Sequence, residues 1–324
     1  IDMDTLAVGG SIALVTNGNG AATVVNTAAI GFAASTVRGA LTATATTGDI
    51  TDSGTLTITG ASIFTTRVGG SNIVLDSSAN AFAAAVTMKA DTGGDETFGN
   101  ITFVDSAAVK LHSSAGTNGD LFIDAGTDLA VGGNLSITAT TGNITQGSEV
   151  AVGGTTTLVT SANDATITLN DADNAFTGAL TITTNDNSGT DAAVIIDGGT
   201  TALIIAASTI DGNLTLTSGA TAGITDSGTV TVGGDLAATT DAGNGVIDMD
   251  TLAVDGSIAL VTNGNGAATV VNDAGLNFAA STVRGALTAT ATTGDISDSG
   301  NLVITGAATF ITTAAGRDII LDQS

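Results

Sequence analysis

The sequence predicts an all-β fold: a right-handed parallel β-helix (β-solenoid) with about 21–22 residues per coil and longer insertions in some coils. Three observations lead to this prediction. They are a long internal repeat, a shorter glycine-marked period within it, and an alternation of apolar and polar residues between the glycines.

The long repeat sets the architecture. Residues 1–78 recur as residues 247–324, and 60 of the 78 aligned positions are identical. Self-similarity of this kind is typical of repeat proteins, in which each unit buries its apolar face against its neighbours. We therefore expect residues 1–324 to form one continuous β-solenoid segment, and we interpret the chain as part of a longer repeat array.

The shorter period is marked by Gly-x-Leu or Gly-x-Ile, as at 133–135, 212–214 and 234–236. Several successive marks lie 21 or 22 residues apart, and others lie 29 or 34 apart, which indicates coils with insertions. The alternative is a tandem of antiparallel sandwiches, for which Asn17-Gly18 would be a hairpin turn. However, a spacing of 21–22 residues is too short for a sandwich domain.

Alternation between the glycines predicts the two faces of each strand. In the segment 55–59, Leu56 and Ile58 alternate with Thr55, Thr57 and Thr59. Since successive strand residues point to opposite faces, Leu56 and Ile58 should face the core and the threonines should face water. No stretch shows a convincing helical period with caps.

Composition limits the function classes. The chain has 31 acidic and 6 basic residues, a formal charge of −25, so it should repel nucleic acid and anionic membranes and attract divalent cations or cationic surfaces. It has no cysteine, which excludes disulfides, and no 18-residue apolar run that would span a membrane. A hydrophobic content of 43% argues against simple disorder.

Paired aspartates are the first candidate site. Asp2 and Asp4, repeated as Asp248 and Asp250, alternate with apolar residues, so each pair should share one strand face about 7 Å apart. Such a pair could be a solvated strand face, part of a Ca²⁺ site or a glycosidase acid and nucleophile. Duplication argues against catalysis, because an active site has no need to recur with the long period.

Loops rich in oxygen ligands are the second candidate. The loop 170–174 carries Asp171 and Asp173, and the loops 91–96 and 186–191 have similar compositions. Turn chemistry alone would explain these loops, and weak divalent binding is the alternative. The sequence implies no organic cofactor, so Ca²⁺ is the one ion for which these residues suggest a site.

Two further patterns argue against catalysis and zinc binding. Asp-Ser-Gly recurs at 52–54, 226–228 and 298–300, but a nucleophilic serine needs a nearby base, and the single His112 cannot serve three copies. One imidazole without cysteine also makes a zinc site implausible. We expect the Asp-Ser-Gly segments to be corners whose side chains bond to the local backbone.

Several segments carry a family resemblance. Those at 142–146, 174–181, 212–217 and 229–236 resemble the repeat region of filamentous-haemagglutinin-type secreted bacterial adhesins, which are giant β-solenoid exoproteins. The resemblance implies a right-handed parallel β-helix, export from a Gram-negative cell, and roles in adhesion, matrix or surface-filament formation.

The expected function is therefore structural or adhesive: a segment of a large secreted or cell-surface protein that forms a rigid rod, filament, matrix or surface layer, without enzymatic activity. Its expected partners are further copies of itself, joined end to end or laterally, and a glycan or host-cell surface. Two alternatives stay open. One is a polysaccharide-acting β-helix enzyme; the other is an ice-binding solenoid, suggested by Thr-x-Thr runs such as those at 215–217 and 229–231.

Overall fold

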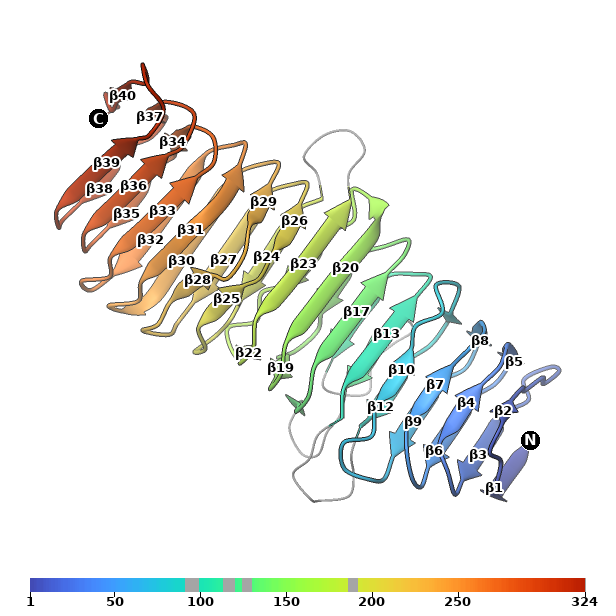
Figure 1. Ribbon diagram of the computed structural model, residues 1–324. Helices are drawn as coiled ribbons and strands as arrows, with labels where there is room; N and C mark the ends of the chain where they lie inside the picture. The colour runs from blue at the N-terminus through green and yellow to red at the C-terminus, as the bar shows by residue number, and fades with distance from the viewer. Residues whose placement is uncertain (91–98, 113–119, 124–129, 186–191, 324) are drawn as a thin grey trace. The chain divides into compact units, whose positions relative to one another are not determined.

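The computed structural model describes residues 1–90, 99–112, 120–123, 130–185 and 192–323. The chain divides into two compact units, Ile1–Ala162 and Asn163–Ser324. Within each unit, short strands stack turn upon turn as a β-solenoid (Figure 1). Every strand pair with a defined register runs parallel, and the described residues contain no helix, which confirms the predicted fold class.

The first unit has two main stacks and shorter ones. One main stack contains β1 (Asp2–Leu6), β3 (Ala22–Asn26), β6 (Leu41–Ala45), β9 (Ser62–Thr66), β12 (Val86–Lys89), β15 (Asp120–Ile123), β14 (Val109–His112) and β18 (Ile144–Gln146). The other contains β2 (Ser11–Ile12), β4 (Ile30–Phe32), β7 (Ile50–Asp52), β10 (Ile73–Leu75), β13 (Ile101–Asp105), β17 (Leu135–Ala139) and β20 (Thr156–Asn163). The short stacks are β5 (Ser35–Val37), β8 (Leu56–Ile58) and β11 (Ala81–Phe82), and β16 (Ala130–Val131) with β19 (Ala151–Val152).

The second unit is built in the same way. One stack contains β21 (Ile167–Leu169), β24 (Val194–Asp197), β27 (Leu214–Ser218), β30 (Leu236–Gly243), β32 (Ile258–Asn263), β34 (Leu276–Phe278) with β35 (Ser281–Val283), β37 (Ile296–Asp298) with β38 (Leu302–Ile304), and β40 (Ile319–Ile320). The other contains β23 (Leu180–Asn185), β25 (Leu203–Ile205) with β26 (Ser208–Ile210), β28 (Ile224–Asp226) with β29 (Val230–Val232), β31 (Ile247–Val254), β33 (Ala268–Asn272), β36 (Leu287–Ala291) and β39 (Ala308–Thr312). The short strand β22 (Ala175–Phe176) precedes β23.

The register confirms the predicted coil length. Leu214 pairs with Leu236, and Leu236 pairs with Ile258, so these turns are 22 residues long. The longer spacings are turns with insertions: Ile101 pairs with Leu135, 34 residues later, and that turn also contains β14 and β15.

The core consists of the alternate residues of each strand. Leu56 and Ile58 are buried and Thr57 and Thr59 are exposed, as the alternation predicts, while Thr55 is half-buried. Phenylalanines stack between turns inside the solenoid; the rings of Phe32 and Phe64 meet edge to face with their centroids 6.3 Å apart. No helix among the described residues is long and apolar enough to cross a membrane.

The duplicated sequence folds in the same way twice. Strands β1 to β10 recur as β31 to β40, and bounds such as those of β3 and β33 differ by the same 246 positions. Because the two copies lie in different units, their internal contacts give two independent views of one structural repeat.

Candidate functional site

A ladder of side chains joins successive turns of the first unit. The side-chain oxygen of Asp49 accepts a hydrogen bond from the backbone N–H of Asn72. The Oδ1 atoms of Asn72, Asn100 and Asn134 continue the series. They accept from the backbone N–H groups of Asn100, Asn134 and Thr155, respectively, and all four bonds are 2.8 Å long. Each ladder residue immediately precedes a strand, so these side chains hydrogen-bond one turn to the next at the start of the strands.

The second unit contains the same device. Asn213 Oδ1 accepts from the backbone N–H of Asp235 at 2.8 Å, and Asp235 Oδ1 accepts from Ser257 at 2.7 Å. The middle position of the Gly-x-Leu/Ile signature is thus a connector between turns in both units.

The signature glycine is needed for close approach between turns. A Cβ on Gly39 would lie 2.5 Å from the backbone oxygen of Asn19, which no side chain tolerates. The N–H of Gly39 donates to Gly20, and the N–H of Gly60 donates to the oxygen of Gly39 at 3.1 Å. Glycine at this position therefore lets adjacent backbones hydrogen-bond at a corner.

The Asp-Ser-Gly segments are corners, but their aspartates bond to the next turn and not to the local backbone. Asp52 accepts from the N–H of Asp76 at 2.9 Å and from Asn80 Nδ2 at 2.7 Å. Asp226 accepts from the N–H and the hydroxyl of Thr251, at 2.8 and 2.6 Å. The prediction of local bonding was wrong because these aspartates accept from donors on the next turn, 24 to 28 residues further along the chain.

Buried polar side chains are the feature that sequence reasoning missed. Ser35 Oγ accepts from the N–H of Leu14 at 3.0 Å and donates to the oxygen of Ala33 at 2.8 Å. Equivalent pairs of bonds are made by Ser208, with Ile182 and Ala206, and by Ser281, with Leu260 and Ala279. The recurring Ala-Ala-Ser-Thr of 33–36, 206–209 and 279–282 was the signal that could have revealed them.

The predicted aspartate pairs lie on outer strand faces. Asp2 and Asp4 are both exposed on β1, and Asp248 and Asp250 are exposed on either side of the buried Met249 on β31. Partial desolvation raises the pKa of the Asp248 carboxyl above its ordinary value, and the neighbouring carboxylates of Asp250 and Asp226 raise the pKa further.

The loop at 170–174 shows turn chemistry. Asp171 Oδ1 accepts from the backbone N–H of Asp173 at 3.0 Å, which is an Asx-turn. Desolvation raises the pKa of the nearby Asp197 carboxyl, the hydrogen bond from the Gly199 N–H opposes that rise, and the carboxylates of Asp241 and Asp171 add to it.

The structure brings some of these acids together in small groups. Among the described residues, no group of three or more His, Cys, Asp or Glu side chains is placed to hold a metal ion. Calcium binding at the predicted aspartates therefore stays a prediction. The candidate loops 91–96 and 186–191 lie outside the described residues, as does the side-chain environment of His112.

Outward threonines line up only in part. On the outer face of the second unit, Thr269, Thr288 and Thr309 are in register on β33, β36 and β39. The next outward-facing row, two residues further along each of these strands, is Val271, Thr290 and Ile311. The surface is thus a mixed row of hydroxyls and methyls, and ice binding stays a prediction.

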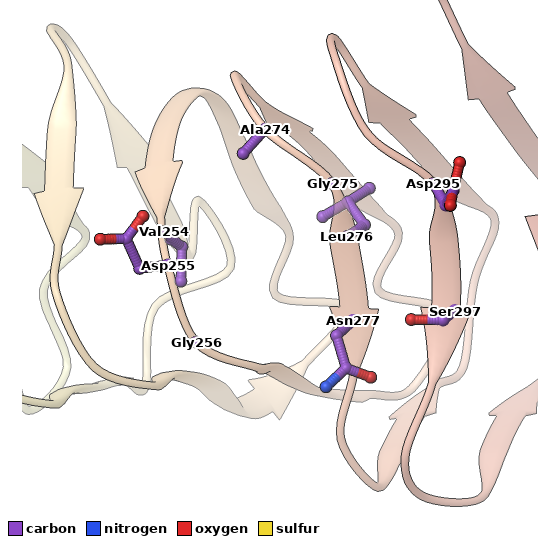
Figure 2. A pocket seen from close by; sticks show the side chains of 9 residues that line it. All are labelled: Val254, Asp255, Gly256, Ala274, Gly275, Leu276, Asn277, Asp295 and Ser297. Atoms are coloured by element: carbon purple, nitrogen blue, oxygen red, sulfur yellow. The ribbon is translucent and has the colours of Figure 1, made fainter. Parts of the chain in front are cut away.

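A shallow open depression of about 220 Å³ lies on the second unit (Figure 2). It crosses three successive turns, at 254–256, 274–277 and 295–297. Its polar side chains are Asp255, Asn277, Asp295 and Ser297, and Leu276 is its buried apolar floor. Asn277 and Ser297 are register partners on adjacent strands, so their side chains project on the same side.

Comparison with known proteins gives one match. Residues 18–89, 98–183 and 264–324, together more than half of the chain, match a family model described as repeats of unknown function (DUF5649). The first and third matches begin at equivalent positions of the internal repeat, since residue 264 follows residue 18 by 246 positions. No curated protein and no solved structure matches the chain.

Proposed function

We propose, from the premise that the chain belongs to the family of repeats of unknown function (DUF5649), that it is a structural and adhesive segment of a large secreted or cell-surface bacterial protein. The solenoid would give that protein a rigid rod that forms a filament, matrix or surface layer. In this proposal the segment is not an enzyme, and its natural location is outside a Gram-negative cell.

The support comes from what the polar side chains do. Many aspartate and asparagine side chains are occupied in holding turns together: the Asp49–Asn72 contact, its successors along the ladder, and the Asp226–Thr251 contact all cross between turns. Side chains committed to the backbone of the next turn are poor candidates for acid–base work, because their oxygens are already hydrogen-bonded. They are well suited to stiffening a stack.

The internal repeat also favours a role that depends on length. In a solenoid each turn contacts only its neighbours, so turns can be added without redesigning the whole. The two copies of the repeat keep the same strands and the same inter-turn contacts, such as Asn72 with Asp49 and Asp318 with Asp295. A segment that is copied while its internal contacts are kept behaves as a modular spacer.

A tandem protein made of two repeat units tests the spacer role. Joining two copies of residues 1–246 head to tail recreates the natural junction at 246–247, because residue 247 begins the second copy of the repeat. Each added 246-residue unit should lengthen the particle by roughly 50 Å, from about 11 turns at about 4.8 Å each. Electron micrographs in which the tandem is wider or globular instead of longer would refute the spacer role.

The adhesive and non-catalytic parts need their own tests. Light scattering of the purified chain measures self-association, and a glycan array followed by cell-surface binding measures adhesion. Depolymerisation assays on acidic and neutral polysaccharides address the enzyme alternative. Turnover of any of these polysaccharides would overturn the non-catalytic proposal. If the chain neither self-associates nor binds a glycan or a cell, the adhesive role is refuted and only the spacer role remains.

A further inference from the structure

The first 54 positions of the two copies of the repeat differ mainly in one place on their surface; the other 12 of the 18 differences lie in 55–78 and 301–324. Over the aligned segments 1–54 and 247–300, only six positions differ. Five of the six are residues that line the depression of the second unit: Asp255, Gly275, Leu276, Asn277 and Ser297. Nine of these 54 positions line the depression, so differences scattered at random would place about one there. The sixth, Asp273, lies directly beside it in the sequence.

The differences hollow the surface. In the first copy the position of Gly275 is occupied by Ala29, whose methyl group packs 3.2 Å from where a Cβ on Gly48 would lie. In the second copy the methyl group is missing, and the backbones of Gly275 and Gly294 approach each other directly. Removing this methyl group opens the centre of the depression.

The differences also add hydrogen-bond acceptors. Gly9 becomes Asp255 and Gly31 becomes Asn277, while Asp295 keeps the carboxylate that the first copy has at Asp49. Figure 2 shows Asp255, Asn277 and Asp295 on three neighbouring segments, with Gly275 and Leu276 between the outer two and the carboxyl group of Asp255 directed away from them. Compared with the equivalent surface of the first copy, the depression has an additional carboxylate and an additional carboxamide, and no additional cationic side chain.

The distance between these hydrogen-bond acceptors limits which ligands can contact them together. The turns that carry Asp255 and Asp295 are two apart, roughly 10 Å along the stack. A calcium ion needs six to eight oxygens at about 2.3–2.6 Å from one point, and the described residues contain no group of three acidic or imidazole ligands so placed. A guanidinium is planar and carries five N–H donors in a fork, so it can meet acceptors on several turns at once.

We infer that this depression binds the guanidinium group of an arginine side chain presented by a partner protein. Asp255 and Asp295 supply charge from the outer turns, and Asn277 and Ser297 accept hydrogen bonds from the middle and last turns. The aliphatic stem of the arginine lies over Ala274 and Gly275, which line the depression above the buried Leu276. The site adds local recognition to the solenoid, and it does not depend on the spacer role.

The repeat itself supplies the test variants. Asp255→Gly, Gly275→Ala and Asn277→Gly together restore the residues of the first copy. Gly9→Asp, Ala29→Gly and Gly31→Asn together install the depression in the first copy. Each new residue already occurs at the equivalent position of the same fold, so both triple variants should fold. Asp76→Asn is the control for loss of one exposed charge elsewhere in the chain.

The measurement is amide NMR of the full chain titrated with N-acetyl-arginine amide, then with an arginine-containing peptide, spermidine, Ca²⁺ and a neutral disaccharide. We expect saturable shifts at Gly256, Gly275 and Asn277 with the arginine amide and the peptide, at least ten-fold weaker binding in the first triple variant, and new shifts near Gly10 in the second. Asp76→Asn should bind as the unmodified chain does.

Three results would overturn the inference. One is an equal response of the unmodified chain and the first triple variant, which would mean unspecific attraction to a chain of charge −25. The second is a saturable shift at these residues with Ca²⁺, spermidine or the disaccharide but not with the arginine amide. The third is the absence of any saturable shift at the depression.

Discussion

The carboxamide of Asn272 pairs with both backbone groups of Val254. Its Oδ1 accepts from the Val254 N–H at 2.8 Å, and its Nδ2 donates to the Val254 oxygen at 3.0 Å. Nδ2 also donates to the oxygen of Gly275 at 2.7 Å. Asn26 makes the same three bonds in the first copy, with Val8 and Ala29. A buried side chain thus replaces a missing strand partner at this corner.

Replacing that side chain should be costly. Asn272→Ala would leave the N–H and C=O of Val254 unpaired in a buried corner, and each such group costs about 1–3 kcal/mol. We expect the local unfolding free energy to fall by about 2–3 kcal/mol. Hydrogen exchange at the Val254 amide, together with thermal unfolding, measures the effect, since stability in a solenoid varies along its length.

The matched control for this change is Asn301→Ala. Asn301 is exposed, so the same chemical change should alter stability by less than about 0.5 kcal/mol. If the Val254 amide is protected equally in Asn272→Ala and in the unmodified chain, the carboxamide is not what holds this corner.

Glycine at the turn-to-turn approach gives a second prediction. Gly39→Ala would place a Cβ 2.5 Å from the oxygen of Asn19, so the two turns must separate. We expect a loss of at least about 2 kcal/mol in unfolding free energy, comparable to an overpacked core. Gly10→Ala is the control, because a Cβ there meets nothing within 4 Å. Equal denaturation midpoints for the two variants would contradict the predicted clash.

The sequence predicts the strands and their faces because both follow from local patterns. Period-2 alternation identifies Leu56 and Ile58 as core residues without knowledge of any contact between turns. Glycine spacing gives the coil length in the same way, as the pairing of Leu214 with Leu236 confirms. Both properties depend only on one turn and its distance to the next, so a short stretch of sequence is enough to show them.

The partners of the polar side chains could not be predicted in this way. Asn134 bonds to Thr155 in the next turn, 21 residues later, whereas the backbone N–H of Asn134 bonds to Asn100, 34 residues earlier. Because turn lengths vary, a partner can be identified only after the register is known. The depression could not be located in this way either, since its lining comes from three turns that are known to be neighbours only once the register is known.

An unsatisfied buried hydroxyl gives a third prediction. Ser62 Oγ is buried between Leu41 and Val86 in the stack and has no hydrogen-bond partner. The equivalent residue of the second copy is Ala308. We therefore expect Ser62→Ala to raise the unfolding free energy by about 1 kcal/mol, because it removes a desolvated polar group. Chemical denaturation measures the change.

The paired control is Ser35→Ala, also at a buried serine. Ser35 bonds to Leu14 and Ala33, so its loss should lower stability by about 1–2 kcal/mol. Opposite signs for the two serine variants are the expected result. A destabilising Ser62→Ala would mean that this hydroxyl has a partner.

A buried carboxyl gives a fourth prediction, concerning pH. Desolvation raises the pKa of Asp105 above its ordinary value of 3.8, against hydrogen bonds from the N–H groups of Phe82, Ala107 and Ser106. The folded state therefore binds the proton of the Asp105 carboxyl more tightly than the unfolded state does. As the pH rises from the unfolded-state pKa through the raised folded-state pKa, the ionised Asp105 lowers the free energy of unfolding by an increasing amount. The penalty is absent below that window and complete above it.

Asp105→Asn should remove this penalty while keeping an acceptor oxygen. The variant should therefore melt at a higher temperature than the unmodified chain at pH 7, and at nearly the same temperature near pH 3, where Asp105 is protonated. Thermal unfolding across this range measures the difference. Asp76→Asn, at an exposed site, is the control for the loss of one carboxylate. A constant offset between Asp105→Asn and the unmodified chain at every pH would show that titration of Asp105 is not responsible.

Calcium binding gives the last prediction. Asp248 and Asp250 share an outer face, and Asp226, which raises the pKa of Asp248, bonds to the N–H of Asp250 at 3.1 Å. Crowded carboxylates repel one another, so a divalent cation should stabilise this face. At equal ionic strength, Ca²⁺ should raise the melting temperature more than Na⁺ does, and Asp250→Asn should reduce that difference whereas Asp76→Asn should not. Equal stabilisation by Ca²⁺ and Na⁺ would mean that these carboxylates respond only to screening, since a specific site must distinguish the two ions at the same ionic strength.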